Sequence, residues 1–410
     1  MLKRTLLLCL VLLAAACPAF CQTNADFGPN PGSDGAFAPA ANVTVNLGAA
    51  PTAAWDAAGA GGGVYDAQKW AVVFKYSSVN IKSGVTVSFK NNVTTAPVVW
   101  LVSGNVTIDG VVNVSAIPSA IQGSFSVPGP GGFRGGVGYN NGRSSSGGFG
   151  IGGGSNRDSS AGFAVAGGSY AAAGASNTGI AGITYGNSQI LPLIGGAGAS
   201  GAADRGGDGG AGGGAILIVA TGTITINGSI FANGGNAAFI DAGGGAGGAV
   251  RLIAPVVDGA GQIQGHAGFN VLSGGAGRIR LETNNYTGNL VSIPVASQAL
   301  PDSPVKIWPD LSIPTVRVVS IGGTAGPADP HANLGAPDVP INSSAAQTVT
   351  LETTNVPPLG TVVVRVVPAS GLAFTVNATF ASGNVAKATW TASITFPPNY
   401  SALQARAALP

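Results

Sequence analysis

Acidic and histidine side chains, the usual groups for acid–base catalysis, are scarce in this chain. Its 410 residues include two histidines, His266 and His331, and two glutamates, Glu282 and Glu352. Hydrolysis of a glycosidic bond normally requires two carboxyl groups, one on each side of the bond. The acids nearest to His266 in the sequence are Asp258 and Glu282, and they form no adjacent pair. We therefore assign no catalytic residue from the sequence.

Side chains that could bind a metal are equally sparse. Asp204 and Asp208 lie in a glycine-rich run whose composition is that of a calcium-binding glycine–aspartate repeat. Such a site needs several copies of the repeat to complete its cage of oxygen ligands, and this chain has one. His331 follows a proline and has no partner at the spacing of a metal ligand. The sequence thus predicts neither a metal site nor a cofactor.

Aromatic residues in a glycine-rich stretch are the remaining candidates for a binding site. About a third of residues 117–213 is glycine, and the same stretch contains Phe133, Tyr139 and Phe149. Flat aromatic rings can stack on sugar rings, so these three residues predict a weak polymer-binding surface. The alternative is that the stretch covers one face of the neighbouring domain and uses its aromatic side chains for packing.

An internal repeat in the sequence indicates the secondary structure on which the candidate site residues lie. Residues 98–110 and 216–228 share an apolar run, a glycine turn, an alternating strand and a second turn. Residues 247–254 repeat the order of 213–220, and 277–281 carry a shorter copy. Such short strands with glycine turns predict stacked coils, because a single coil cannot bury its apolar side chains alone.

We therefore predict an all-β fold whose main part, residues 71–300, is a right-handed parallel β-helix (β-solenoid) with a large glycine-rich insertion at 117–213. A sandwich or a hairpin meander is the alternative, since antiparallel hairpins use similar Asn-Gly turns. Residues 301–314 are rich in proline and predict a linker. Val/Thr-rich alternation over 315–410 then predicts an Ig-like β-sandwich with Trp390 in its core.

The predicted coil, with the strand and turns at 223–228 and 232–235, resembles glycine-rich parallel β-helix proteins of bacterial surfaces. It also loosely resembles the pectin-lyase-like β-helix enzymes. The first resemblance implies a structural or adhesive role, and the second implies polysaccharide cleavage. Residues 265–267 and 278–280 are similar to the Gly-His-Gly and Arg-Ile-Lys motifs of polygalacturonases, but the Asp-Asp and Asn-Thr-Asp motifs are missing. The repeat alignment also places His266 at a turn.

The first 21 residues predict export. A basic start precedes a short apolar run, and Ala19-Phe20-Cys21 offers small residues at the cleavage positions, so residues 1–21 form a predicted signal peptide. A lipoprotein modified at Cys17 is the alternative. Residues 22–70 are then an N-terminal extension and cap. All three cysteines lie within the signal peptide, so we expect no disulfide in the mature chain.

Charge and hydropathy narrow the range of partners. The net charge is +2 and 8% of the residues are charged, which gives no electrostatic footprint for nucleic acid. No apolar run reaches the length of a membrane-spanning helix. We expect a secreted protein of the extracellular space, the periplasm or the cell surface, with a non-catalytic structural or adhesive function. Its expected partner is an extracellular polysaccharide or another cell-surface polymer. The alternative function is that of a polysaccharide-processing lyase or hydrolase.

Overall fold

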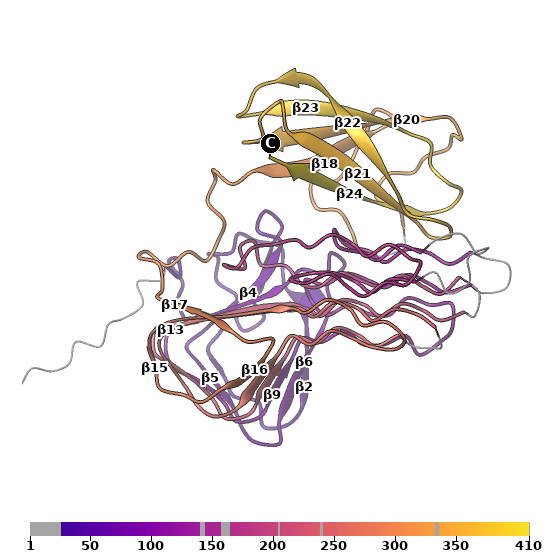
Figure 1. The fold of residues 1–410 in the computed structure, drawn as a ribbon. Coiled ribbons are helices and arrows are strands. Elements are labelled where there is room, and N and C mark those ends of the chain that lie inside the picture. Colours follow the sequence, from indigo (N-terminus) through magenta and orange to yellow (C-terminus); the bar gives the residue numbers. More distant parts are fainter. Residues whose placement is uncertain are drawn as a thin grey trace, which may run out of the picture.

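A computed structural model of the protein describes residues 26–139, 144–156, 165–203, 206–237, 241–332 and 336–409. The predicted signal peptide lies outside these residues. Within them the chain is all-β, as predicted: its strands form sheets of eleven, six and seven strands, and the sole helical element is a 3-10 turn, η1 (Leu47–Ala49). The first two sheets are built almost entirely from parallel strands and belong to the N-terminal part (Figure 1).

In this N-terminal part, up to three consecutive short strands make up a repeating unit, which we call a rung. Equivalent strands of successive rungs pair in parallel. The first strands of the rungs are β4 (Ala71–Tyr76), β7 (Val98–Val102), β10 (Ala215–Ala220), β13 (Ala249–Asp258) and β15 (Arg278–Tyr286). The second strands are β5 (Ser78–Ile81), β8 (Val106–Ile108) and β11 (Thr223–Ile226), which pairs with the end of β13. The third strands are β6 (Thr86–Lys90), β9 (Val111–Asn113), β12 (Ser229–Phe231), β14 (Gln262–Gln264) and β16 (Val291–Ile293).

Short strands border the rungs. β1 (Ala36–Phe37) pairs with β5, β2 (Val43–Asn46) pairs with β6, and β17 (Ser297–Ala299) pairs with β15, all in parallel. β3 (Val64–Asp66) is antiparallel to β4, so a tight connection leads from one to the other.

The register of the stacked strands is the one that the sequence repeat predicts. Ile216 of β10 lies beside Val98 of β7 and beside Val250 of β13. Burial of an aliphatic or aromatic side chain contributes about 1.5–3 kcal/mol. Columns of such side chains therefore hold the rungs together, for example the buried column Phe74, Trp100, Ile218, Leu252 and Leu281.

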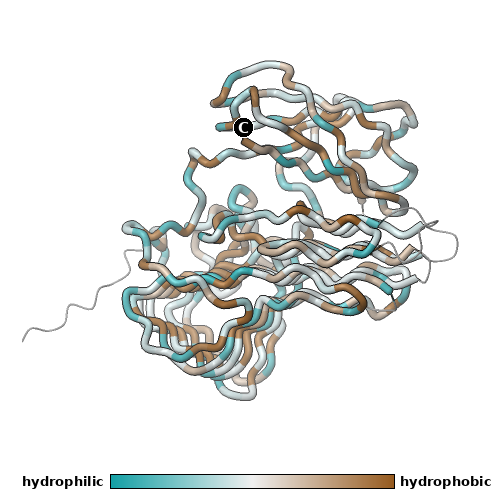
Figure 2. Tube along the Cα trace, viewed as in Figure 1, coloured by the Kyte–Doolittle hydropathy of each residue, from teal (hydrophilic) through white to brown (hydrophobic). Residues whose placement is uncertain are grey.

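Between rungs the chain leaves the sheets in long excursions at residues 114–214, 232–248 and 265–277. Their described segments are extended and lie side by side, as the magenta to orange traces in Figure 1 show. We call the packed segments within 129–214, 232–248 and 265–277 the glycine bundle. Figure 2 shows mostly pale, near-neutral colours along them, whereas the rungs contain strongly apolar and strongly polar residues. Backbone contacts, more than apolar side chains, must therefore hold the bundle.

Hydrogen bonds between segments of the glycine bundle recur at every third residue. Three residues per turn is the period of the polyproline II conformation. One segment donates amide hydrogens from Gly196, Ala199 and Ala202 to the carbonyls of Gly213, Gly210 and Gly207, respectively. The same segment accepts from the amides of Phe133, Gly136 and Tyr139.

The segments approach so closely that only glycine fits at many contacts. A Cβ atom at Gly212 would overlap the carbonyl oxygen of Gly196, and one at Gly198 would overlap that of Arg134. The glycine content of this region therefore reflects close backbone packing. The later excursions contribute segments to the same packed bundle as the described residues of 129–214.

The C-terminal part is a curled antiparallel sheet with the strand order β19-β18-β20-β23-β22-β21-β24. β18 and β24 lie close to each other, which gives the sheet an enclosed apolar side. Trp390 is 3% exposed in this core, and its indole N–H donates to Thr353 Oγ1 at 3.0 Å. The strands are β18 (Thr315–Ile321), β19 (Thr324–Ala325), β20 (Gln347–Thr354), β21 (Thr361–Pro368), β22 (Phe374–Gly383), β23 (Ala388–Ile394) and β24 (Ser401–Ala408).

The C-terminal sheet lies over the glycine bundle (Figure 1). The guanidinium of Arg365 on β21 donates to the carbonyls of Gly148, Gly150 and Gly153 at 2.9, 3.3 and 3.1 Å. It also donates to Gln404 Oε1 of its own sheet at 2.9 Å. Burial lowers the pKa of Arg365 to about 10, so this contact is charged at neutral pH. One arginine thus ties the sheet to several backbone carbonyls of the bundle.

The proline-rich connection between the two parts packs against the rungs. Val305 and Ile307 are buried in the apolar cluster on the outer face of the first sheet. Trp308 lies edge-on to Trp55, with 5.6 Å between the ring centroids. The connection is therefore attached to the rungs through Val305, Ile307 and Trp308.

Candidate functional site

Two of the three aromatic residues predicted from the sequence to bind polymer lie in one cavity. Phe133 and Phe149 come from adjacent segments of the glycine bundle and line a cavity of about 360 Å³. Residues of the turn before β4, residues 94–95 before β7, Pro128 and residues of the C-terminal part complete its walls. Phe133 is half-buried and Phe149 is 6% exposed, whereas Tyr139 is 41% exposed and does not line the cavity. We call this cavity the aromatic cleft.

Trp70 adds a third aromatic ring to the cleft. Asp66 shapes the preceding turn, because its Oδ1 accepts two backbone amide hydrogens at 2.8 and 3.1 Å. Trp70 itself has φ +47°, which is uncommon for a bulky residue, and its indole N–H donates to the carbonyl of Thr94 at 3.0 Å. Its ring is stacked on Phe133, with 6.4 Å between centroids and 29° between planes. Trp70 could not be predicted from the sequence, because a lone tryptophan beside a strand carries no pattern of its own.

Arg134 supplies a positive charge to the cleft. It follows Phe133 in the chain and lines the same cavity. Its guanidinium carbon lies 5.3 Å from the ring centroid of Phe125 and 5.7 Å from that of Phe149, within the range of cation–π interactions. Among the residues that the structure describes, this guanidinium has no hydrogen-bond or ion-pair partner. Burial lowers the pKa of Arg134, and nearby Tyr400 offsets part of that shift.

The far wall of the cleft belongs to the C-terminal part and is fixed by polar contacts. Tyr65 donates its hydroxyl hydrogen to Asp329 at 2.6 Å and accepts one from Thr94 at 3.0 Å. Burial raises the pKa of the Tyr65 phenol, and the hydrogen bond to Asp329 raises it further. The amide of Ala332 donates to the carbonyl of Val93 at 2.9 Å. These contacts set the distance between the two walls.

A larger cavity of about 1080 Å³ lies within the C-terminal part, between β18, β24 and residues 337–344. Val318, Phe396 and Leu403 line it and also pack against the core of the curled sheet. Phe133, Tyr139 and Phe149 do not line this cavity. We interpret this larger cavity as the open side of the C-terminal core. The aromatic cleft is therefore the candidate site.

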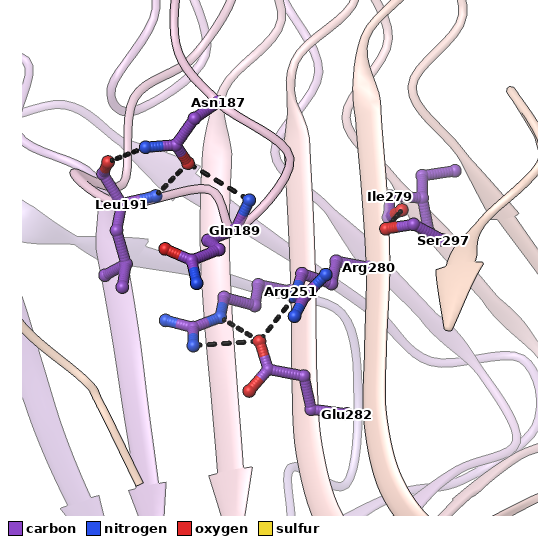
Figure 3. A network of polar contacts seen from close by, with 8 residues as sticks. All are labelled: Asn187, Gln189, Leu191, Arg251, Ile279, Arg280, Glu282 and Ser297. Atoms are coloured by element: carbon purple, nitrogen blue, oxygen red, sulfur yellow. Dashed lines mark hydrogen bonds and ion pairs between the residues drawn. The ribbon is translucent and has the colours of Figure 1, made fainter. Parts of the chain in front are cut away.

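Glu282, one of the acids considered for catalysis, is held in a buried ion-pair network (Figure 3). Its side chain is 1% exposed, and Oε1 accepts from Nε of Arg251 at 2.9 Å and from Nε of Arg280 at 2.6 Å. Figure 3 also shows the loop 187–191 beside this network. The Asn187 side chain closes this loop by donating to the carbonyl of Leu191 at 2.7 Å. Glu282 therefore has a structural use outside the cleft.

Asp258, Asp109 and His266 also lie outside the cleft. Asp258 ends strand β13, Asp109 lies in the bend after β8, and His266, expected at a turn, lies instead in the excursion 265–277. Asp109 accepts from the side chain of Asn227 at 2.8 Å, in the matching turn of the next rung. His266 is exposed, and its amide donates to the side chain of Asn233 at 2.8 Å. Within the described ranges, no group of three or more His, Cys, Asp or Glu side chains is placed to hold a metal ion.

Of the two aspartates compared with calcium sites, Asp204 lies outside the described residues. Asp208 is 0% exposed and accepts backbone amide hydrogens from Gly123 and Gly138, each at 2.9 Å through one of its oxygens. Burial raises the pKa of Asp208, and these hydrogen bonds oppose that shift. Asp208 thus fastens residues near 123 to the glycine bundle.

Comparisons of the chain with known protein families, with curated proteins and with solved structures gave no match. In the part of the chain that the structure covers, no helix has the length and apolar character needed to cross a membrane.

Proposed function

We propose that this protein is a secreted, non-catalytic structural or adhesive protein that binds an extracellular polysaccharide or other cell-surface polymer in the aromatic cleft. The observation that carries this proposal is the stacked pair Trp70 and Phe133 in a cavity of about 360 Å³. Cavities of about 300–1,000 Å³, lined by aromatic side chains with a few polar groups, are typical ligand sites. Sugar rings offer apolar C–H faces that pack on such rings.

Two fold assignments belong to this proposal, both finer than the all-β architecture described above. We propose that the stacked rungs form a right-handed parallel β-helix and that the C-terminal sheet is an Ig-like β-sandwich. The parallel register of β4, β7, β10, β13 and β15 supports the first assignment. Parallel crossovers are right-handed in about 98% of cases. The closeness of β18 and β24 and the buried Trp390 support the second assignment.

Residues 1–21 support the proposal of export, and the rigid walls of the cleft support a binding role. Phe133 and Phe149 belong to the hydrogen-bonded glycine bundle, and Trp70 is fixed by its own indole hydrogen bond. Side chains that are ordered before the ligand arrives lose little conformational entropy on binding. Tyr65 and Asp329 hold the opposing wall in the same way.

The test is retention of the mature protein on a panel of pectins, alginate, xylan and related polymers, followed by titration calorimetry. We expect Trp70→Ala and Phe133→Ala each to weaken binding about ten-fold, which corresponds to about 1.4 kcal/mol. Tyr139→Ala is the matched control, because Tyr139 is exposed outside the cleft and should leave binding unchanged.

The same samples are assayed for new reducing ends and unsaturated products. Turnover of any polymer would replace the non-catalytic proposal with the polysaccharide-processing alternative. Binding that survives both Trp70→Ala and Phe133→Ala, in folded variants, would contradict the assignment of the cleft.

A further inference from the structure

We propose that the aromatic cleft selects polymers that carry an anionic group, either a uronate carboxylate or a sulfate ester, and that Arg134 binds this group. This inference rests on the proposed polymer-binding function. It names the ligand class, which the aromatic rings alone leave open, because ring stacking is possible for neutral and charged sugars alike.

The unused hydrogen-bonding capacity of Arg134 carries the inference. A guanidinium has five N–H donors in a planar fork that matches a carboxylate or a sulfate. Arg134 lines the cleft, yet among the described residues its guanidinium has no hydrogen-bond or ion-pair partner. Arg365, a second described arginine at the junction between the two parts, has carbonyl and amide oxygens as acceptors. Of these two described arginines, Arg134 is therefore the one whose donors are left for a ligand.

The rings around Arg134 hold it without using its donors. Phe125 and Phe149 lie 5.3 and 5.7 Å from the guanidinium carbon, and their own rings are packed edge to face at 5.7 Å. Cation–π contacts hold the guanidinium charge near the rings, and a phenylalanine ring has no oxygen or nitrogen acceptor for its N–H groups. Phe133, the preceding residue, presents its ring to the same cavity. A sugar ring stacked on Phe133 therefore lies near a guanidinium that is already positioned.

The charges lining the cleft are compatible with an anionic ligand. Among the described residues, the other formally charged group in the lining is Asp329, and His331 and Tyr400 are titratable groups there, Tyr400 being the one that interacts with Arg134. Asp329 accepts the hydroxyl hydrogen of Tyr65 at 2.6 Å, so part of its charge is stabilised at the far wall. Arg134 is at the wall formed by the glycine bundle, beside the aromatic rings.

The experiment compares pairs of polymers with the same backbone, one with the anionic group and one without it. Polygalacturonate is set against its methyl ester, and dextran sulfate against dextran, with wild type and the variants Arg134→Gln, Trp70→Ala and Arg406→Gln. Arg406 is exposed on β24 and serves as the control arginine. We expect wild type to bind at least one charged polymer about ten-fold more tightly than its neutral partner. The preferred pair shows whether the anion is a carboxylate or a sulfate.

Arg134→Gln should abolish this preference while affinity for the neutral polymer stays unchanged, and Trp70→Ala should weaken both. Arg406→Gln should behave as wild type. The preference should also shrink at 0.5 M NaCl, because salt screens an accessible ion pair. If Arg134→Gln fails to fold by thermal melting, Arg134→Lys keeps the charge but loses the fork and should retain part of the preference.

Equal affinity of wild type for charged and neutral polymers would overturn the inference while leaving the cleft as the binding site. An equal loss on both polymers in Arg134→Gln would do the same, since it would show that Arg134 only supports the rings. Absence of binding to every polymer would overturn the proposed function as well.

Discussion

Lys75 lies on the face of β4 that points away from the interior of the rungs, beside Leu101 of β7. The segment before β1 runs along it, and Asp34 accepts its backbone amide hydrogen at 2.6 Å. The Lys75 side chain is 0% exposed, and its ammonium nitrogen has no hydrogen-bond partner among the described residues. Desolvation therefore lowers the pKa of Lys75, and the charges of Asp34 and Asp56 offset part of the shift.

Replacing this buried charge should stabilise the protein in a pH-dependent way. A lowered pKa means that folding disfavours the charged form, so the penalty is largest well below the folded pKa. It disappears as pH rises towards the ordinary lysine value of about 10.4. We expect Lys75→Met to raise the free energy of unfolding by about 1–3 kcal/mol at pH 7 and by less at pH 10.

Urea unfolding at the two pH values measures both differences. Lys82→Met is the control, because Lys82 is exposed and its replacement should change stability little at either pH. A Lys75→Met protein that is less stable than wild type at pH 7 would show that the ammonium group is stabilised by its surroundings.

Individual site residues were predictable from the sequence only where composition set them apart. Phe133 and Phe149 are large side chains among many small ones, but they share this with the other aromatic residues of 117–213, such as Tyr139 and Tyr170. Trp70 and Arg134 could not be singled out, because their roles depend on a turn built by Asp66 and on rings contributed by other segments. The cleft joins parts of the chain that are more than 200 residues apart, and no local pattern reports such proximity.

At the level of elements, the glycine bundle should be unusually sensitive to the smallest possible substitution. A Cβ at Gly212 would overlap the backbone carbonyl of Gly196, which cannot move without breaking the neighbouring hydrogen bonds. We expect Gly212→Ala to lower the free energy of unfolding by at least about 3 kcal/mol, at the upper end of the overpacking range. Thermal and urea unfolding report this loss.

Gly62→Ala is the matched control for that substitution. Gly62 is exposed, has no positive φ, and a Cβ there would come no closer than 3.9 Å to another atom. Its replacement should change stability by less than about 1 kcal/mol, as most surface substitutions do. Equal effects of the two alanines would argue against the close packing of segments.

Strand pairing was far more predictable than the conformation of the glycine-rich excursions. Parallel stacking puts equivalent residues of the repeat directly beside one another, so the sequence alignment of Ile216 with Val98 is also the register of β10 and β7. In the glycine bundle, each segment has several neighbours on different sides. The position that must be glycine therefore differs from segment to segment, and the three-residue period is hidden in the sequence.

For the molecule as a whole, Arg365 should control how the C-terminal part sits on the glycine bundle. Removal of a buried, hydrogen-bonded charge partner costs about 2–5 kcal/mol. We expect Arg365→Met to weaken the contact by that order, to enlarge the radius of gyration in small-angle scattering, and to expose the proline-rich connection to proteases. Polymer binding should weaken as well, because the cleft takes its walls from both parts.

Arg406→Met, on the neighbouring strand β24, is the control for that change because Arg406 is exposed. Identical scattering profiles and protease patterns for Arg365→Met and Arg406→Met would mean that other contacts suffice to hold the parts together. One such contact is the hydrogen bond from the amide of Gly371 to the carbonyl of Ser145.

Because the segments of the glycine bundle repeat every three residues, the bundle should tolerate insertions and deletions of three residues better than those of one or two. Inserting one residue before Gly196 would turn every later residue of that segment by a third of a revolution, so that alanine methyl groups would face carbonyls that now face glycine. Inserting three residues restores the orientation and lengthens the segment by about 9 Å. In relatives of this chain, insertions and deletions within the bundle segments should therefore come in multiples of three amino-acid residues.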